Sequence, residues 1–135
     1  MSKPDFTGTW RFDPARSSLQ IQLPEAVTFE IQHHEPRFRL SRTLVIGGAS
    51  DTIAIDLTTD GRLVVCHHRG MDITARLNWD GQALLFHSSL TRAGEQAENT
   101  VRYLLADQDQ TFIAEEKFRG RELQYDNRWV FERPS

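Results

Sequence analysis

The chain has 135 residues and only one cysteine, Cys66. A single cysteine excludes an internal disulfide framework and a cysteine-rich metal site, and it is typical of proteins in a reducing compartment. The sequence also lacks an apolar run long enough for a membrane span or a signal peptide. These absences predict a soluble, cytoplasmic protein.

Neither sign of charge dominates the composition. Sixteen Lys and Arg residues face nineteen Asp and Glu residues, which gives a net charge of -3. This charge offers no electrostatic basis for binding nucleic acid. A hydrophobic fraction of 39% with 26% charged residues is typical of a folded globular protein, and the length predicts one domain over residues 1–135.

Motifs for catalysis and metal binding are missing as well. The sequence has no Gly-x-Ser-x-Gly, no phosphate-binding glycine loop and no His-Glu-x-x-His pattern. His33-His34 and His67-His68 are adjacent pairs, which on strands point to opposite faces and cannot bind one metal from the same side. A zinc site of His33, His67 and His87 would require three strands to converge. We therefore expect no catalysis, no metal and no cofactor.

Short alternating segments separated by turn residues fill most of the chain. Asp60-Gly61, Asp80-Gly81 and Ala93-Gly94 lie between such segments, and Asp-Gly suits the two positive φ angles of a type I′ hairpin turn. The only place for a helix is one short turn at Asp13–Leu19, where Asp precedes Pro14. We predict an antiparallel meander of about ten strands, near residues 6–12, 27–34, 37–46, 51–58, 62–68, 72–79, 82–92, 96–106, 111–118 and 122–132.

The two ends of the chain favour a closed barrel. Phe6, Gly8, Trp10 and Phe12 alternate along the first strand and therefore share one face. A glycine at position 8 lets a second segment approach closely, and the Trp10 indole can close the base of a barrel. The last strand ends in the aromatic sequence Trp129-Val130-Phe131. A closed barrel pairs its first and last strands, which removes both free edges.

These end segments carry a family resemblance. Phe6-Thr7-Gly8-Thr9-Trp10 resembles the first-strand motif of the calycin superfamily, which contains the lipocalins and the fatty-acid-binding proteins, and Val130-Phe131-Glu132-Arg133 is similar to the closing strand of the latter. The resemblance implies an all-β fold with a single antiparallel up-and-down β-barrel, lipocalin-like, with at most one short helical turn. It also implies that Arg128 packs over Trp10, with Gly8, as a structural closing group.

Two departures from the fatty-acid-binding proteins alter that expectation. Their Arg-x-Tyr pair for the ligand carboxylate aligns with Trp129 and Phe131, so this pair is absent here. Residues 13–26 are too few for their helical lid. The resemblance therefore implies a more open cup without the usual carboxylate clamp.

Alternate residues of a strand point to opposite faces, and we predict that the more apolar of the two alternating sets faces inward. For residues 62–68 this set is Leu63, Val65 and His67, and for residues 82–92 it is Leu85 and His87. Polar side chains on the inward faces would be costly in a solid core but not in a water-containing lumen. The candidate ligand-binding residues are His33, Arg42, His67, His87, Tyr103, Glu116, Tyr125 and Asn127.

We therefore predict non-catalytic binding of a small, largely hydrophobic, lipid-like ligand, oriented by Arg42, the lumen histidines and Tyr103 or Tyr125. The structural alternatives for Arg42 and Glu116 are an ion pair between them or a position near an open end in water. One alternative function is haem binding through an inward His67 or His87. The other is a protein-interaction module with a filled barrel and an arginine-rich outer face. The sequence leaves a homodimer open.

Overall fold

The computed structural model describes residues 3–134, which form ten antiparallel strands and no helix. Each predicted strand is present with its ends within two residues of the expected positions, so the all-β prediction is confirmed. The strands are β1 (Gly8–Phe12), β2 (Ala26–His34), β3 (Arg37–Ile46), β4 (Ala49–Thr58), β5 (Val64–His68), β6 (Met71–Asp80), β7 (Ala83–Arg92), β8 (Glu95–Ala106), β9 (Thr111–Arg119) and β10 (Gln124–Glu132).

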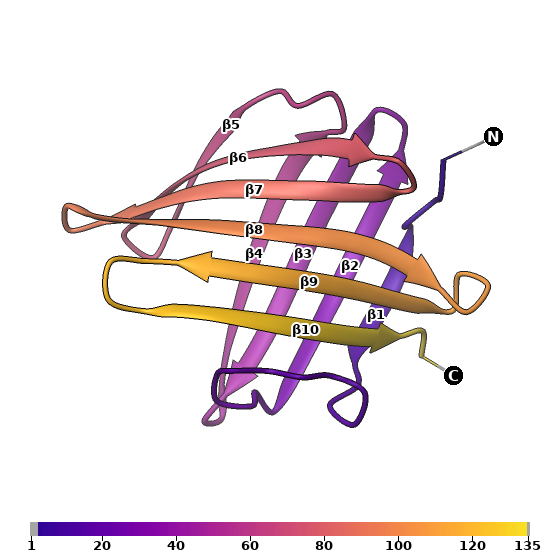
Figure 1. The fold of residues 1–135 in the computed structure, drawn as a ribbon, viewed down its shortest axis with the longest axis horizontal. Coiled ribbons are helices and arrows are strands. Elements are labelled where there is room, and N and C mark those ends of the chain that lie inside the picture. The colour runs from indigo at the N-terminus through magenta and orange to yellow at the C-terminus, as the bar shows by residue number, and fades with distance from the viewer. Residues whose placement is uncertain (1–2, 135) are drawn as a thin grey trace.

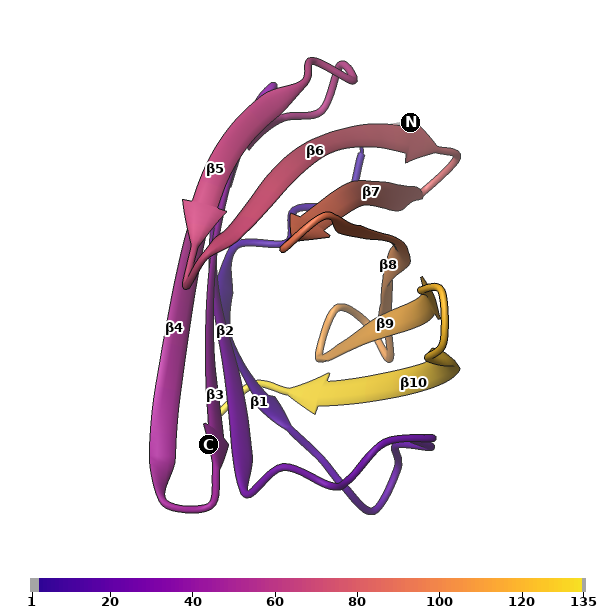
Figure 2. The same cartoon turned by 90° about the vertical axis from the view of Figure 1, so that its left-hand side faces the viewer.

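The strands form one sheet in the order β4-β3-β2-β1-β10-β9-β8-β7-β6-β5. Strands β1 to β4 lie behind β6 to β10 and cross them steeply, so the sheet folds over into two facing layers (Figures 1 and 2). The first and last strands pair antiparallel, with Arg11 opposite Glu132 and Phe12 opposite Phe131. The predicted up-and-down barrel, joined through its terminal strands, is confirmed.

Beyond this short ladder, residues 13–25, here called the strap, continue along the edge of β10. The Asp13 N–H donates to the Val130 carbonyl at 2.8 Å, and the backbones of Ser18 and Arg128 exchange two hydrogen bonds of 2.8 and 2.9 Å. The strap then crosses the end of the barrel before it enters β2 (Figure 2). The backbone edge that β1 leaves open on β10 is therefore covered.

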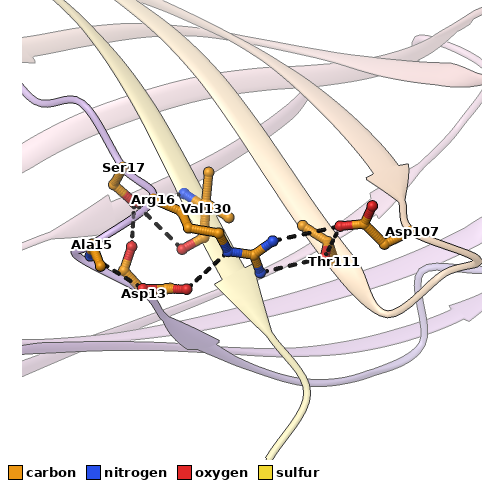
Figure 3. A network of polar contacts seen from close by, with 7 residues as sticks. All are labelled: Asp13, Ala15, Arg16, Ser17, Asp107, Thr111 and Val130. Carbon is orange, nitrogen blue, oxygen red and sulfur yellow. Dashed lines mark hydrogen bonds and ion pairs between the residues drawn. The ribbon is translucent and has the colours of Figure 1, made fainter.

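The strap begins with a polar network around Arg16 (Figure 3). Asp13 accepts from Arg16 Nε at 2.9 Å, and the other side of the guanidinium reaches Asp107 in the β8–β9 turn and Thr111 at the start of β9, each at 3.4 Å. The Ser17 hydroxyl accepts the Val130 N–H at 2.8 Å and donates to the Asp13 carbonyl. The segment expected to hold at most one helical turn thus has a turn at residues 14–16 that is fastened to two other elements.

The opposite edges of the sheet, β4 and β5, meet differently. No backbone ladder joins these two strands within residues 3–134. Side chains hold the edges instead, because Asp51 on β4 accepts from His68 Nε2 at 2.9 Å and also pairs with Arg69 in the β5–β6 turn. We call these three residues the clasp.

The hairpin turns depart from one expectation. Ala93-Gly94 has φ angles of 52° and 82°, as a type I′ turn requires. Asp60 and Asp80 are not among the residues with positive φ, and Asp80 is the last residue of β6 rather than a central turn residue. The prediction that both Asp-Gly pairs occupy the centres of type I′ turns was wrong. The β6–β7 turn is Gly81-Gln82, one residue later, and Asp60 forms an isolated antiparallel bridge with Asn78.

An aromatic cluster fills the base of the barrel, as the position of Trp10 predicted. Trp10 and Phe6 are fully buried, and the indole N–H donates to the Phe6 carbonyl at 3.0 Å. Phe112 packs against both, with ring centroids 5.5 Å from Trp10 and 6.0 Å from Phe6. Between this base and the strap the described residues leave a cavity.

The group over Trp10 is Arg133 and not Arg128, so that prediction was wrong. The Arg133 guanidinium carbon lies 4.1 Å from the centroid of the indole, and Nη1 donates to the Thr7 carbonyl at 3.2 Å. Arg128 is exposed on the outer parity of β10. Strand β10 ends at Glu132, which still pairs with Arg11 of β1. Arg133 is the next residue, so its side chain can fold back over Trp10.

Gly8 carries a φ of +147°, and a Cβ at this position would collide with the Arg133 guanidinium. We predict that Gly8→Ala lowers the free energy of unfolding by about 2 kcal/mol, because both the backbone and the Arg133 contacts must shift. The measurement is urea unfolding. Gly47→Ala is the control, since a Cβ there meets nothing within 4 Å at a φ of +60°, and should cost about 1 kcal/mol. Equal losses for the two variants would contradict the close approach at Gly8.

The clasp should make the free energy of unfolding depend on pH. The hydrogen bond from His68, followed by that from Arg69, holds the pKa of Asp51 below its usual value. A carboxyl with a depressed folded-state pKa stabilises the fold above its unfolded pKa, and this contribution is lost as the pH falls through the folded value. We expect Asp51→Ala to lower the free energy of unfolding at pH 6 by about 1 kcal/mol more than Asp56→Ala, whose exposed pair with Arg39 contributes little.

Urea unfolding of wild type and both variants at pH 6 and at pH 3 measures this effect. The cost of Asp51→Ala should shrink at the lower pH, where the carboxyl begins to be protonated. A cost that is the same at both pH values would show that the Asp51 charge does not hold the β4 and β5 edges together.

Candidate functional site

A cavity of about 260 Å³ lies between the aromatic base and the strap. Its wall is mostly aliphatic and aromatic, with a small number of polar groups, which is the usual composition of a small-molecule site. Gln22 in the strap and Ile46 at the end of β3 are exposed and also line the cavity, so it opens to solvent beside the strap. The lining residues are Ile21, Gln22, Pro24, Val27, Phe29, Leu40, Arg42, Leu44, Ile46, Ile53, Ile55, Met71, Ile73, Phe86, Ser88, Leu90, Asn99, Val101, Tyr103, Glu116, Tyr125 and Trp129.

The strap covers more of this cavity than the predicted open cup implied. It contains no helix, but Ile21, Gln22 and Pro24 all contribute to the lining. Pro24 is buried, and the Gly48 N–H donates to Glu25 at 2.8 Å, which ties the end of the strap to the β3–β4 turn.

Four of the predicted site residues line the cavity together. Arg42 comes from β3, Tyr103 from β8, Glu116 from β9 and Tyr125 from β10. The two layers of the sheet therefore bring a guanidinium on one side and a carboxylate with two phenols on the other into a single space. Their roles toward a ligand stay predictions.

His67 and His87 do not reach this space, so their inward placement was wrong. The His67 side chain is 71% exposed and pairs with Asp72 at 2.6 Å, while His87 faces Glu98 at 3.3 Å on the outer surface. In antiparallel pairs, directly opposed residues share a face. Because inward Leu77 pairs with Phe86, the inward parity of β7 is the even one, and the same argument selects Val64 and Cys66 on β5.

His33 and Asn127 are buried but lie outside the cavity lining. His33 is 4% exposed and packs against Phe6, Phe38 and Trp79 in the base, where its Nδ1 accepts the Phe6 N–H at 3.2 Å. Asn127 accepts the Gln20 N–H of the strap at 2.7 Å through its side-chain oxygen. These contacts give both residues structural positions.

Glu116 is the most highly coordinated polar group of the cavity. Its Oε1 accepts from Asn127 Nδ2 and Trp129 Nε1, both at 2.9 Å, and its Oε2 accepts from Asn99 Nδ2 at 3.0 Å. All three donors are neutral and come from the neighbouring strands β8 and β10. They hold the carboxylate in one orientation and leave its charge without an ion pair among the described residues.

Arg42 has the opposite character. It lies opposite Phe29 and Ile53 in the β2–β3 and β3–β4 ladders, so apolar side chains flank it on both sides. Its Nε is buried and has no hydrogen-bond partner among residues 3–134, and it forms no ion pair with Glu116 there. The structural alternative of an Arg42–Glu116 pair is therefore wrong, and the cavity keeps an uncompensated donor group.

The two tyrosines are neutral hydrogen-bonding groups at ordinary pH. Burial, reinforced by the negative charge of Glu116, raises the pKa of Tyr103, and the same causes raise the pKa of Tyr125 to about 12. Tyr125 also stacks on Phe118 with ring centroids 4.8 Å apart. Each phenol can donate or accept one hydrogen bond toward the cavity.

Three polar cavity residues, Gln22, Ser88 and Asn99, were not among the predicted candidates. Asn99 lies on the same face of β8 as Val101 and Tyr103. Continuing the predicted inward set of this strand two residues toward its start would therefore have included Asn99. Ser88 follows from the corrected parity of β7. Gln22 lies in an irregular segment that carries no periodic signal.

Within residues 3–134 no three His, Cys, Asp or Glu side chains gather as ligands for a metal ion. The same part of the chain contains no helix with the length and apolarity to span a membrane.

The structure was compared with known proteins. No protein-family model and no curated protein sequence matches this chain. Secretory abundant heat soluble protein 4 from Ramazzottius varieornatus superposes with a TM-score of 0.68 at 12% identity, covering 100% of this chain and 99% of that one. Human cRBP IV gives a TM-score of 0.64 at 12% identity, with 97% and 99% covered. The zebrafish ileal bile-acid-binding protein complexed with cholic acid gives 0.60 at 10% identity, with 96% and 98% covered.

The chain has a calycin-type barrel fold. This confirms the fold that the two end segments implied. At identities of 10–12% the likeness establishes the architecture of the calycin-type barrel and nothing about its ligand.

In this calycin-type barrel, we predict that Glu116→Ala lowers the free energy of unfolding by about 2–4 kcal/mol, because three donors of a part-buried network lose their acceptor. Urea unfolding measures the loss. Glu115→Ala is the matched control, since Glu115 is the exposed neighbour on the outer face of β9. Similar small losses for both variants would show that the Glu116 hydrogen bonds do not organise the wall.

Proposed function

We propose that this protein binds a small, largely apolar molecule with one anionic group in its cavity, and that it does so without catalysis. The observation that carries the proposal is the buried, unpartnered Arg42 Nε in a mostly apolar wall. An anionic ligand group would give this donor its missing acceptor, while the aliphatic lining would bury the rest of the ligand.

The solved structures with this fold support the apolar part of the proposal. One is described as a complex with cholic acid, and another as a fatty-acid-binding protein from the brain tissue of Drosophila melanogaster. The ligands belong to those proteins. The cavity of this chain has a mostly apolar lining with a few polar groups, which suits ligands of that kind.

The alternative functions lose their main supports. Haem binding required His67 or His87 in the lumen, and both lie on the outer surface. The interaction module required a filled barrel, but the barrel contains a cavity. A protein partner for the outer face, a homodimer and the cytoplasmic location stay predictions.

Calorimetric titration with decanoate tests the proposal, with decanol as the neutral counterpart. We expect Arg42→Ala to weaken decanoate binding by about 10- to 100-fold, because a hydrogen bond to a charged group is lost. The affinity for decanol should change by less than about threefold, since apolar burial is largely retained.

Arg39→Ala is the matched control. Arg39 lies on the same strand but on the outer face, where it pairs with Asp56 at 3.0 Å. This variant should bind decanoate like wild type. Equal losses for decanoate and decanol in Arg42→Ala would remove Arg42 from the site, and absence of decanoate binding to wild type would reject the proposed function.

A further inference from the structure

Glu116 determines which way the Asn99 amide points. An ionised carboxylate only accepts hydrogen bonds, so the Asn99 group 3.0 Å from Glu116 Oε2 must be the NH₂ donor. The two ends of an amide side chain are otherwise interchangeable in shape, and their assignment follows from the hydrogen-bond network. The neighbouring carboxylate therefore fixes the Asn99 oxygen on the other side.

That oxygen has no partner. Asn99 Oδ1 is buried and accepts no hydrogen bond from any described residue. Ser88 and Asn99 both line the cavity, but the Ser88 hydroxyl donates to the Asn99 backbone carbonyl at 3.4 Å rather than to the side chain. A buried acceptor without a donor costs free energy, which a ligand donor can recover.

The second unpartnered buried atom of the cavity has the opposite sense. Arg42 Nε is a donor on β3, and Asn99 Oδ1 is an acceptor on β8. Strands β3 and β8 belong to the two facing layers of the barrel (Figures 1 and 2). A ligand that satisfies both must present an acceptor toward one wall and a hydrogen-bond donor toward the other.

We propose that the ligand of this cavity is a hydroxylated organic acid, whose anionic group binds Arg42 and whose hydroxyl donates to Asn99 Oδ1, with Glu116 as the positioning residue that aims the Asn99 amide. This inference rests on the proposed function, because it assumes an anionic ligand at Arg42. It adds a second polar requirement, which an unsubstituted fatty acid does not meet.

The experiment compares decanoate with a series of decanoates that carry one hydroxyl at different positions along the chain. At least one hydroxydecanoate should bind wild type about 5- to 50-fold more tightly than decanoate, because its hydroxyl satisfies the buried acceptor. The keto analogue of that compound offers an acceptor and no donor, so it should bind no more tightly than decanoate.

Variants test the roles of Asn99 and Glu116 separately. Asn99→Leu should abolish the preference for the hydroxyl, measured as the ratio of hydroxydecanoate to decanoate affinity within the same variant, whereas Gln96→Leu, on the exposed part of the same strand, should keep the preference. Glu116→Gln frees the Asn99 amide to turn over, so the discrimination between hydroxyl and keto analogues should fall by about tenfold, whereas a merely structural role for Glu116 would leave it unchanged.

The outcomes separate the two proposals. Binding of decanoate without a gain from any hydroxyl position would overturn the hydroxy-acid inference and leave the proposed function standing. A gain that persists in Asn99→Leu would also overturn it, because the hydroxyl would then be bound elsewhere. Failure of wild type to bind any compound of the series would reject both.

Discussion

The pairing of β1 with β10 is the constraint on which the rest of the molecule depends, because it turns ten strands into a barrel with an inside. Only two residue pairs form this ladder, so the strap extends the covered edge and Arg133 stacks on Trp10 below it. Aromatic side chains then fill the base. The remaining space lies between this base and the strap, which is why the cavity is at this end.

Inside that space the electrostatics follow from an uneven distribution of partners. Glu116 receives three neutral donors, whereas Arg42 Nε receives no acceptor from the described residues. A fully satisfied carboxylate stiffens the wall that carries it. Arg42 Nε on the facing wall is an unsatisfied donor, so a hydrogen bond to it would add binding free energy for a ligand.

Strand positions could be predicted from alternation and turn residues, but the inward face of a strand could not always be. On β5 both parities carry apolar side chains, Leu63 and Val65 on one and Val64 and Cys66 on the other, so composition does not choose between them. The turn does choose, because a two-residue turn at Arg69-Gly70 pairs Val64 with inward Ala75. Arg42, Tyr103, Glu116 and Tyr125 were predictable because their strands are unambiguous. The strap and Arg133 were not, since contacts between distant segments leave no periodic pattern.

The most direct test of the central claim is to locate a bound acid by NMR, using methyl-labelled isoleucine, leucine and valine in a titration with decanoate. Binding inside the barrel should shift the methyl resonances of Ile55, Ile73 and Val101, which line the cavity. Leu63 and Val65, which are 60% and 67% exposed on the outside, should stay unchanged. Shifts confined to Leu63 and Val65, or no saturable shifts at all, would contradict binding inside the barrel.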